Sequence, residues 1–181
     1  REMRSLILFR HGKSDWNADF ASDHERPLAN RGKEAALCMG RMLSESGQLP
    51  QLAVSSSALR ARATLQLAVR AGRWHCPIRV EDALYGSTPD RIMNWIKALE
   101  DNPECLLLTG HEPTWSELAG RLIGEGSVRV PTASMLKIDF EILLDSDLAV
   151  IAKAKTAGVP ITVKVSDIYF TAKGRVCAQL I

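Results

Sequence analysis

Short runs of hydrophobic residues alternate along this chain with longer stretches that are apolar on one side only. The first run, residues 5–9, is apolar at every position after Ser5. A strand with two apolar faces is typical of a parallel sheet that helices cover on both sides. Further runs of strand length occupy residues 52–55, 77–81, 105–109 and 135–140. These segments predict five buried or partly buried strands.

The stretches between these strands have the spacing of amphipathic helices. They predict helices over 30–45 with Gly47 at the stop, over a segment that ends at Gly72, over a segment that begins at 89, and over 114–123. We expect Asn30 to cap the first helix and Ser56 or Ser57 to cap the second. Thr88, which precedes Pro89, is the expected cap of the third.

Strand and helix alternate four times before residue 125, and this order predicts the fold class. It indicates an α/β protein, a three-layer α/β/α sandwich with a mainly parallel central sheet. Beyond residue 141 the pattern is weaker, with a helix expected over 148–157 and strands over 161–170 and 175–181. No linker or repeat is visible, so residues 1–181 are expected to form a single domain.

Charge and cysteine content narrow the possible functions. The 181 residues contain 23 Lys and Arg against 21 Asp and Glu, a formal net charge of +2. This balance argues against binding of nucleic acid or of an anionic membrane surface as the main task. No segment approaches the roughly 20 apolar residues of a membrane span. The four cysteines are scattered without zinc-ligand spacing and are expected to be structural. With no secretory signal visible, we expect a cytoplasmic location.

Basic side chains follow three of the predicted strands. Arg10 and His11 come after the first strand, Arg60 follows the second, and His111 follows the fourth. Ligands of open α/β sheets bind at the carboxyl ends of the strands, so the fold would bring these four residues to one crevice.

These residue types suit a phosphoryl group. Arginine forks bind phosphate oxygens through paired hydrogen bonds and stay charged at working pH. A neutral histidine offers a ring nitrogen as nucleophile, and a protonated one adds a donor and a positive charge. Gly12 removes side-chain bulk beside His11 and allows a close approach.

Four segments carry a resemblance to a known family. LFRHGKSDWN at 8–17, SSALRARAT at 56–64 and GHEP at 110–113 resemble the three motifs of the histidine phosphatase superfamily, the phosphoglycerate mutase-like clan. The short chain and ERPLANRG at 25–32 resemble its SixA-type phosphohistidine phosphatase branch. The resemblance covers residues 4–140 and implies a phosphoglycerate mutase-like fold.

The resemblance also implies roles for single residues. His11 would be the nucleophile that forms a phosphohistidine intermediate, while Arg10, Arg60 and His111 would hold the phosphate oxygens. Asn17 occupies the position of a polar contact near the phosphate. The reaction would need no metal and no cofactor.

Other polar residues near these motifs are expected to have structural or surface roles. Ser14 is expected to fix its loop. Arg62 is expected to be solvated, because helix residues two apart do not face the same way. His24 and His75 have no partner motif and are expected to be structural or exposed.

One departure from the family pattern concerns the general acid. Members that cleave phosphomonoesters carry a Glu shortly after the third strand, and here that position falls on Tyr85 or Gly86. Glu81 and Asp82 are the remaining acid candidates. An alkoxide leaving group needs a proton in the transition state, whereas an imidazole, with a pKa of about 6.5, needs less help.

Three hypotheses follow for the function. The first is a phosphatase that removes phosphate from phosphohistidine on a protein or peptide. The second is a small-molecule phosphomonoesterase with Asp82 or Glu81 as general acid. The third is an inactive phosphate-binding module. The expected partner is therefore a phosphorylated protein or a small phosphate compound, and the sequence predicts no oligomeric state.

Overall fold

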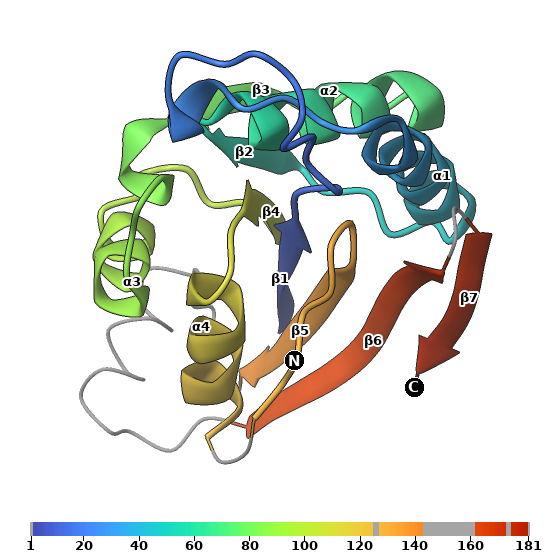
Figure 1. Ribbon diagram of the computed structural model, residues 1–181. Helices are drawn as coiled ribbons and strands as arrows, with labels where there is room; N and C mark the ends of the chain where they lie inside the picture. The colour runs from blue at the N-terminus through green and yellow to red at the C-terminus, as the bar shows by residue number, and fades with distance from the viewer. Residues whose placement is uncertain (1, 125–126, 143–161, 173–174, 181) are drawn as a thin grey trace.

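A seven-stranded sheet runs through the computed structural model of the protein (Figure 1). The structure describes residues 2–124, 127–142, 162–172 and 175–180. The spatial order of the strands is β3-β2-β4-β1-β5-β6-β7. Their bounds are β1 Glu2–Arg10, β2 Leu52–Ser56, β3 Ile78–Glu81, β4 Cys105–Gly110, β5 Met135–Ile142, β6 Thr162–Ala172 and β7 Arg175–Leu180.

The sheet has a parallel half and an antiparallel half. Strands β3, β2, β4 and β1 pair in parallel, as expected from the helices that connect them. Strand β5 pairs antiparallel with β1, and β6 and β7 continue the antiparallel part to the other edge. The carboxyl ends of β1, β2 and β4 therefore meet at one end of the sheet.

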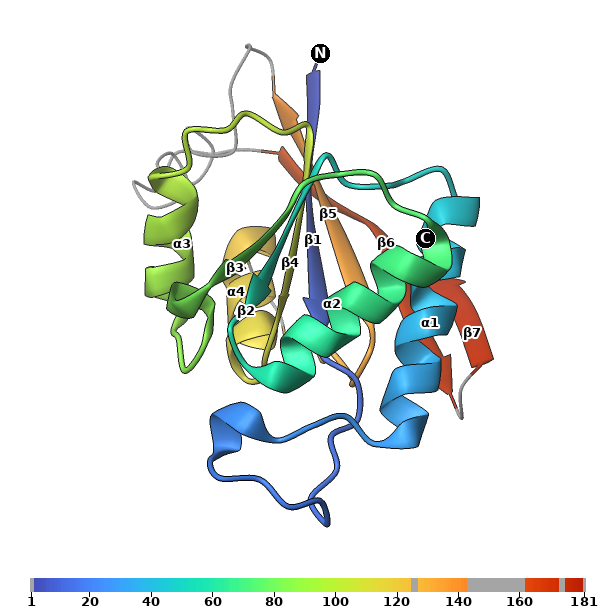
Figure 2. The ribbon, with the colours of Figure 1, turned by 90° about the horizontal axis from the view of Figure 1, so that it is seen from above.

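In the described part of the chain, two helices lie on each face of the sheet, which gives the expected three layers. Helices α1 (Asn30–Glu45) and α2 (Leu59–Gly72) lie on one face. Helices α3 (Pro89–Lys97) and α4 (Thr114–Ile123) lie on the other, as the view from above shows (Figure 2). Two short 3-10 turns, η1 (Asp23–Glu25) and η2 (Asp82–Leu84), lie in the connections.

The central strand β1 contributes to both cores, which explains its continuous apolar run. Leu6 and Leu8 pack into the cluster under α3 and α4. Ile7 and Phe9 pack into the cluster under α1 and α2. All four side chains are buried, as the alternation of side chains along a strand requires.

Helix caps differ from the sequence expectation at two of three starts. Thr88 caps α3 as predicted, with its Oγ1 accepting the Arg91 N–H at 3.3 Å. Asn30 is instead the first residue of α1, whose cap position is Ala29. Helix α2 begins at Leu59 with Ala58 at the cap position. Ser56 is still the last residue of β2, and Ser57 lies between the strand and the cap.

The C-terminal strands agree with the expectation, since β6 and β7 overlap the predicted segments 161–170 and 175–181. The predicted helix over 148–157 lies outside the described residues. A single domain over residues 1–181 stays a prediction. Within the described part of the chain, none of the helices has both the length and the apolar character that crossing a membrane requires.

Candidate active site

Arg10, His11, Arg60 and His111 line one pocket at the carboxyl end of the parallel half of the sheet. They come from the end of β1, the first turn of α2 and the residue that follows β4. The fold thus brings together residues that are up to 101 positions apart in the sequence.

The main chain fixes His11 between two neighbouring segments. The His11 N–H donates to Gly110 O at 3.0 Å, and His11 O accepts from the Ala133 N–H at 3.0 Å. Nδ1 of the ring lies 2.7 Å from Gly12 O. A carbonyl oxygen only accepts, so Nδ1 carries the proton and Nε2 keeps a lone pair. This is the tautomer that a nucleophilic Nε2 requires.

Burial keeps the His11 ring neutral. It lowers the pKa of His11 to about 4, and the positive charges of Arg60, Arg10 and Arg26 act in the same direction, while the hydrogen bond to Gly12 opposes them. The residue is 8% exposed. At neutral pH the ring is therefore uncharged rather than an imidazolium.

Thr64 connects the first motif to the second. The Gly12 N–H donates to Thr64 Oγ1 at 3.0 Å, and Thr64 Oγ1 donates to Arg60 O at 2.7 Å. A Cβ on Gly12 would lie 2.7 Å from Gly32 O, so only glycine allows the loop to pass the start of α1 this closely. The loop that holds His11 is thereby tied to the helix that carries Arg60.

Asp23, the first residue of the turn η1, forms an ion pair with Arg60. Arg60 Nη1 donates to Asp23 O at 2.7 Å, and Nη2 donates to Asp23 Oδ2 at 3.0 Å. The Arg60 side chain is 7% exposed, and that of Asp23 is 50% exposed. Hydrogen bonds from Arg26, Arg60 and Tyr85 and the charge of Arg60 outweigh the opposing effect of desolvation, and they lower the pKa of Asp23 to about 2.

His111 stands opposite His11, with ring centroids 5.2 Å apart. Its Nε2 lies 2.7 Å from Ser56 Oγ, at the end of β2. Burial, together with the neighbouring His11 and Arg60, lowers the pKa of His111 to about 3, although the charge of Asp23 opposes the shift. This ring is therefore also neutral until an anion enters the pocket.

Three of the four expected residues carry a buried nitrogen without a hydrogen-bond partner among the described residues. These atoms are Arg10 Nε, Arg60 Nε and His111 Nδ1. Arg10 uses Nη1 to donate to Val130 O at 2.9 Å. Buried polar groups are normally paired, and the three residues that carry these unpaired nitrogens all line one pocket, which is consistent with a site for an anion.

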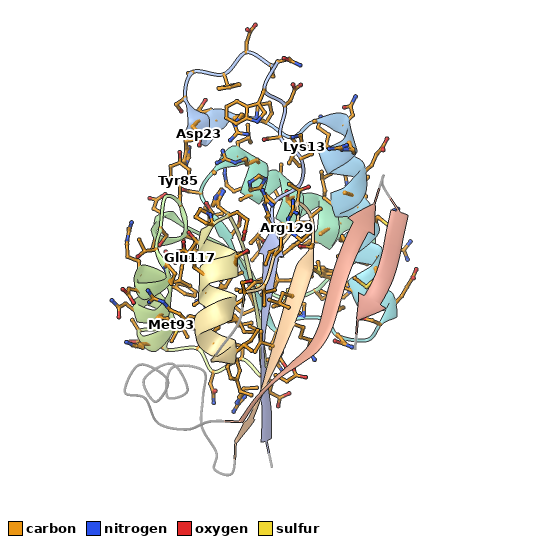
Figure 3. All side chains as sticks on the ribbon, turned by 60° about the horizontal axis from the view of Figure 1, so that its bottom comes forward. Lys13, Asp23, Tyr85, Met93, Glu117 and Arg129 are labelled. Carbon is orange, nitrogen blue, oxygen red and sulfur yellow. The ribbon has the colours of Figure 1, made fainter. Side chains whose placement is uncertain are left out.

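Asp23, Arg26 and Tyr85 also line the pocket, although none of them was predicted from the sequence to have a role in the site. Figure 3 shows Asp23 and Tyr85 side by side at the edge of the site, where the Tyr85 hydroxyl donates to Asp23 Oδ2 at 3.1 Å. Arg26 is buried, donates to Ser14 Oγ, and lies 3.7 Å over the Trp16 ring. The segment 25–32 was the available signal for Arg26, and nothing in the pattern marked Asp23.

Several residues singled out in the sequence lie outside the pocket lining. Asn17, Glu81 and Asp82 do not line it. Asn17 is exposed and its N–H donates to Asp15 Oδ1 at 2.9 Å. Glu81 and Asp82 end β3 and begin η2, whereas Tyr85, Gly86 and Ser87, beyond this turn, line the pocket.

The remaining expectations are met in part. His75 is exposed, whereas His24 is half-buried and bonds Ser57 Oγ at 2.9 Å. Arg62 is not freely solvated as expected, because its Nε donates to Ser57 O at 2.9 Å and this bond folds the side chain back onto the start of its own helix. Ser14 is buried and accepts a hydrogen bond from Arg26, in keeping with a role in fixing the loop.

Comparisons with known proteins agree with this geometry. The sequence profile of the histidine phosphatase superfamily (branch 1) matches residues 6–87. An uncharacterised protein of Mycobacterium leprae (strain TN) is 36% identical over 121 residues, 65% of this chain and 73% of that protein. The chain belongs to the histidine phosphatase superfamily.

Other relatives place this histidine phosphatase more closely. An uncharacterised chloroplastic protein of Arabidopsis thaliana is 33% identical over 140 residues, 72% of this chain but only 64% of the plant protein. Among solved structures, SixA of Agrobacterium tumefaciens, a candidate phosphohistidine phosphatase, is 27% identical with a TM-score of 0.67, covering 75% of this chain and 91% of SixA. SixA of Nakamurella multipartitia is 26% identical with a TM-score of 0.68, and the match covers 84% of this chain and 91% of that SixA. The fold is phosphoglycerate mutase-like, and the similarity is to the SixA-type branch.

Two carboxylates line the pocket of this histidine phosphatase, and both accept hydrogen bonds. Asp23 accepts from Arg60, Arg26 and Tyr85. Glu112 accepts from the Ser116 N–H at 2.9 Å and from Ser116 Oγ. Neither is placed as a proton donor. Within the described ranges, no group of three or more His, Cys, Asp or Glu side chains is arranged to hold a metal ion.

Proposed function

We propose that this protein is a phosphatase that hydrolyses phosphohistidine on a protein or peptide, with His11 as nucleophile. The observation that carries the proposal is the composition of the pocket. It combines a neutral histidine whose Nε2 keeps its lone pair with three arginines and a second histidine, and both carboxylates of the described lining accept hydrogen bonds. Such a site can bind a phosphoryl group but offers no carboxylic acid to a leaving group.

In the proposed first step, His11 Nε2 attacks phosphorus, a new P–N bond forms, and the P–N bond to the substrate imidazole breaks. The electron pair of the broken bond stays on the substrate nitrogen, which takes up a proton from solvent. Water then attacks phosphorus on His11, phosphate leaves, and Nε2 regains its lone pair. Arg10, Arg60 and His111 stabilise the charge on the phosphoryl oxygens in both steps.

The leaving group decides between this reaction and ester cleavage. An imidazole nitrogen has a pKa of about 6.5 and accepts a proton readily, whereas an alkoxide needs a general acid in the transition state. Asp23, with a pKa of about 2, is ionised at neutral pH and cannot serve as that acid in the free protein. Glu112, the other carboxylate of the described lining, accepts hydrogen bonds from Ser116. That both carboxylates are engaged as acceptors favours a phosphoramidate substrate.

Access to the pocket supports a macromolecular substrate. Two of the lining residues, Trp16 and Lys13, are exposed to solvent, Trp16 by 64%. A phosphorylated side chain can approach from this side. The cytoplasmic location expected from the sequence stays a prediction, as does the oligomeric state.

The test compares two substrates with one enzyme preparation, a phosphohistidine peptide and an alkyl phosphomonoester such as glycerol phosphate. Because general acid catalysis contributes about 10²–10⁴-fold, we expect kcat/KM for the ester to be lower by about that factor. His11→Asn is expected to reduce phosphohistidine turnover by at least about 10³-fold. His75→Asn, at an exposed histidine outside the pocket, is the matched control and is expected to act like the wild type.

Each alternative has an outcome of its own in this experiment. Faster turnover of the ester would favour the phosphomonoesterase. Binding of phosphate without turnover of either substrate would favour the inactive phosphate-binding module. Labelled phosphate trapped on His11 during turnover supports the covalent intermediate, and label found on another residue would contradict it.

A further inference from the structure

Asp23 is the acidic residue in contact with the arginine expected to bind phosphate. Its main-chain oxygen accepts a hydrogen bond from Arg60 Nη1, and its carboxylate accepts one from Arg60 Nη2. No other described residue forms a hydrogen bond with the Arg60 guanidinium. The guanidinium therefore has an anionic partner before any phosphoryl group arrives.

We propose that Asp23 competes with the phosphoryl group for Arg60, and that binding transfers Arg60 Nη2 from the Asp23 carboxylate to a phosphoryl oxygen. In this exchange Asp23 sets how much negative charge a ligand must carry to bind. The inference deepens the proposed function and rests on it for the identity of the substrate, but it concerns oxyanion binding, which can be measured without any substrate.

The burial of the two partners fits an exchange of this kind. The Arg60 side chain is 7% exposed and is held in the first turn of α2, so its position changes little. The Asp23 side chain is 50% exposed and lies on the short turn η1. The carboxylate is thus the partner that can move away into solvent.

Asp23 would keep other partners after releasing Arg60. Its Oδ1 accepts from Arg26 Nη2 at 2.8 Å and from Arg26 Nε at 3.3 Å. Its Oδ2 also accepts from the Tyr85 hydroxyl at 3.1 Å. Losing one hydrogen bond therefore leaves no isolated charge on Asp23, and the contact from Arg60 Nη1 to Asp23 O can persist.

The exchange would select ligands by the number of negative charges that they carry. A singly charged anion would replace one carboxylate contact by an equivalent one and gain little. A terminal phosphoryl group with two negative charges gains more from the same cations, including Arg10 and the unpaired Arg60 Nε. Asp23 therefore favours terminal phosphoryl groups over singly charged phosphodiesters.

The experiment measures the dissociation constant of inorganic phosphate by calorimetry for the wild type and for Asp23→Asn. Asparagine keeps the size and one acceptor oxygen but removes the competing charge, so we expect the dissociation constant to fall by about tenfold. Asp23→Glu keeps the charge and is expected to bind phosphate within about threefold of the wild type. Asp19→Asn, an exposed acid of the same loop, is the control for a general charge effect.

Unchanged or weaker phosphate binding by Asp23→Asn would overturn the proposal, because a residue that only orients Arg60 would weaken binding when removed. Tightening of the same size in Asp19→Asn or in Asp23→Glu would also overturn it. Thermal melts of all variants show that they are folded. Failure of phosphohistidine turnover with these binding results intact would count against the proposed function and not against the competition.

Discussion

At the scale of single residues, buried polar side chains hold the basic residues of the pocket in position. Ser56 is the clearest case, because it is fully buried and touches both a site residue and a helix start. Its Oγ lies 2.7 Å from His111 Nε2 and accepts the Ala58 N–H at 3.3 Å. The serine predicted as a helix cap is therefore better described as the support of His111.

This arrangement predicts that Ser56→Ala lowers kcat more than it lowers stability. The variant removes the hydrogen bond between Ser56 Oγ and His111 Nε2, so we expect kcat to fall about tenfold. The lost buried hydrogen bonds should reduce the free energy of unfolding by about 1–2 kcal/mol. Steady-state kinetics and denaturant melts measure the two effects.

The neighbouring serine provides the comparison. Ser57 is also buried but bonds His24, so Ser57→Ala should lose stability of similar size with less than a threefold change in kcat. Equal effects of the two variants on kcat would mean that His111 does not need Ser56.

Residue types and strand ends were enough to predict which four side chains meet. Arg10, His11, Arg60 and His111 each follow a buried strand or begin the helix after it, and parallel strands bring such positions together. Asp23 could not be predicted in this way. It lies in a long irregular connection, and the path of such a loop depends on tertiary contacts, such as the one between Arg26 and Ser14, that no periodicity encodes.

At the scale of elements, helices α1 and α2 pack closely against each other at two glycines, Gly40 and Gly72. A Cβ on Gly40 would lie 2.1 Å from Ala68 O, and one on Gly72 would lie 2.2 Å from Gly40 O. The Trp74 Nε1–H also donates to Gly40 O at 3.1 Å. Because α2 carries Arg60 and the start of α1 packs on the His11 loop, this contact sets the geometry of the site from a distance.

Gly40→Ala is therefore expected to destabilise the protein. Alanine normally favours a helix over glycine, so a loss of stability would show that the helices cannot separate. Overpacking of this kind costs about 1–3 kcal/mol, which corresponds to a fall in Tm of roughly 2–12 °C for a chain of this size. Thermal melts measure it.

Arg41→Ala is the control for this substitution, because Arg41 is the exposed next residue of the same helix. We expect its Tm to stay within about 2 °C of the wild type. A Tm of Gly40→Ala at or above the wild-type value would contradict the close contact between α1 and α2.

The helix starts show the limit of prediction at this scale. Thr88 before Pro89 is a local signal, and it is correct. Ser56 and Ser57 carry the same kind of signal, but the strand continues through Ser56 and both hydroxyls bond histidines of the site region instead. Tertiary contacts override the local preference of a serine there.

At the scale of the whole molecule, the parallel half of the sheet can be predicted from the sequence more readily than the antiparallel half. The parallel strands each read as short apolar runs because both faces are covered, and β1 shows this most clearly. The antiparallel strands β6 and β7 were located from weaker patterns. Pairing of β5 against β1 in the antiparallel direction could not be read from its own sequence, because strand direction depends on the connection and not on the strand.

The charges of the site also act on the stability of the whole molecule. The pKa of His11 falls to about 4 and that of His111 to about 3, both from 6.5. Below pH 6.5 the unfolded chain therefore binds protons at these two residues that the folded protein does not bind. Stability rises with pH where the unfolded state binds more protons, so it must fall as the pH decreases from about 6.5 towards 4.

We expect the free energy of unfolding, measured by urea melts in buffer without phosphate or sulfate, to be flat above pH 7 as far as these groups are concerned. Below pH 6 each histidine should contribute a slope of up to about 1.4 kcal/mol per pH unit. A double variant with asparagine at both positions should lose this slope between pH 6 and 4, while His75→Asn should keep it. Added phosphate should reduce the slope in the wild type, because a bound anion favours the protonated rings. An equal slope in the double variant would mean that other groups cause the acid sensitivity and that the two histidines are not held neutral by the fold.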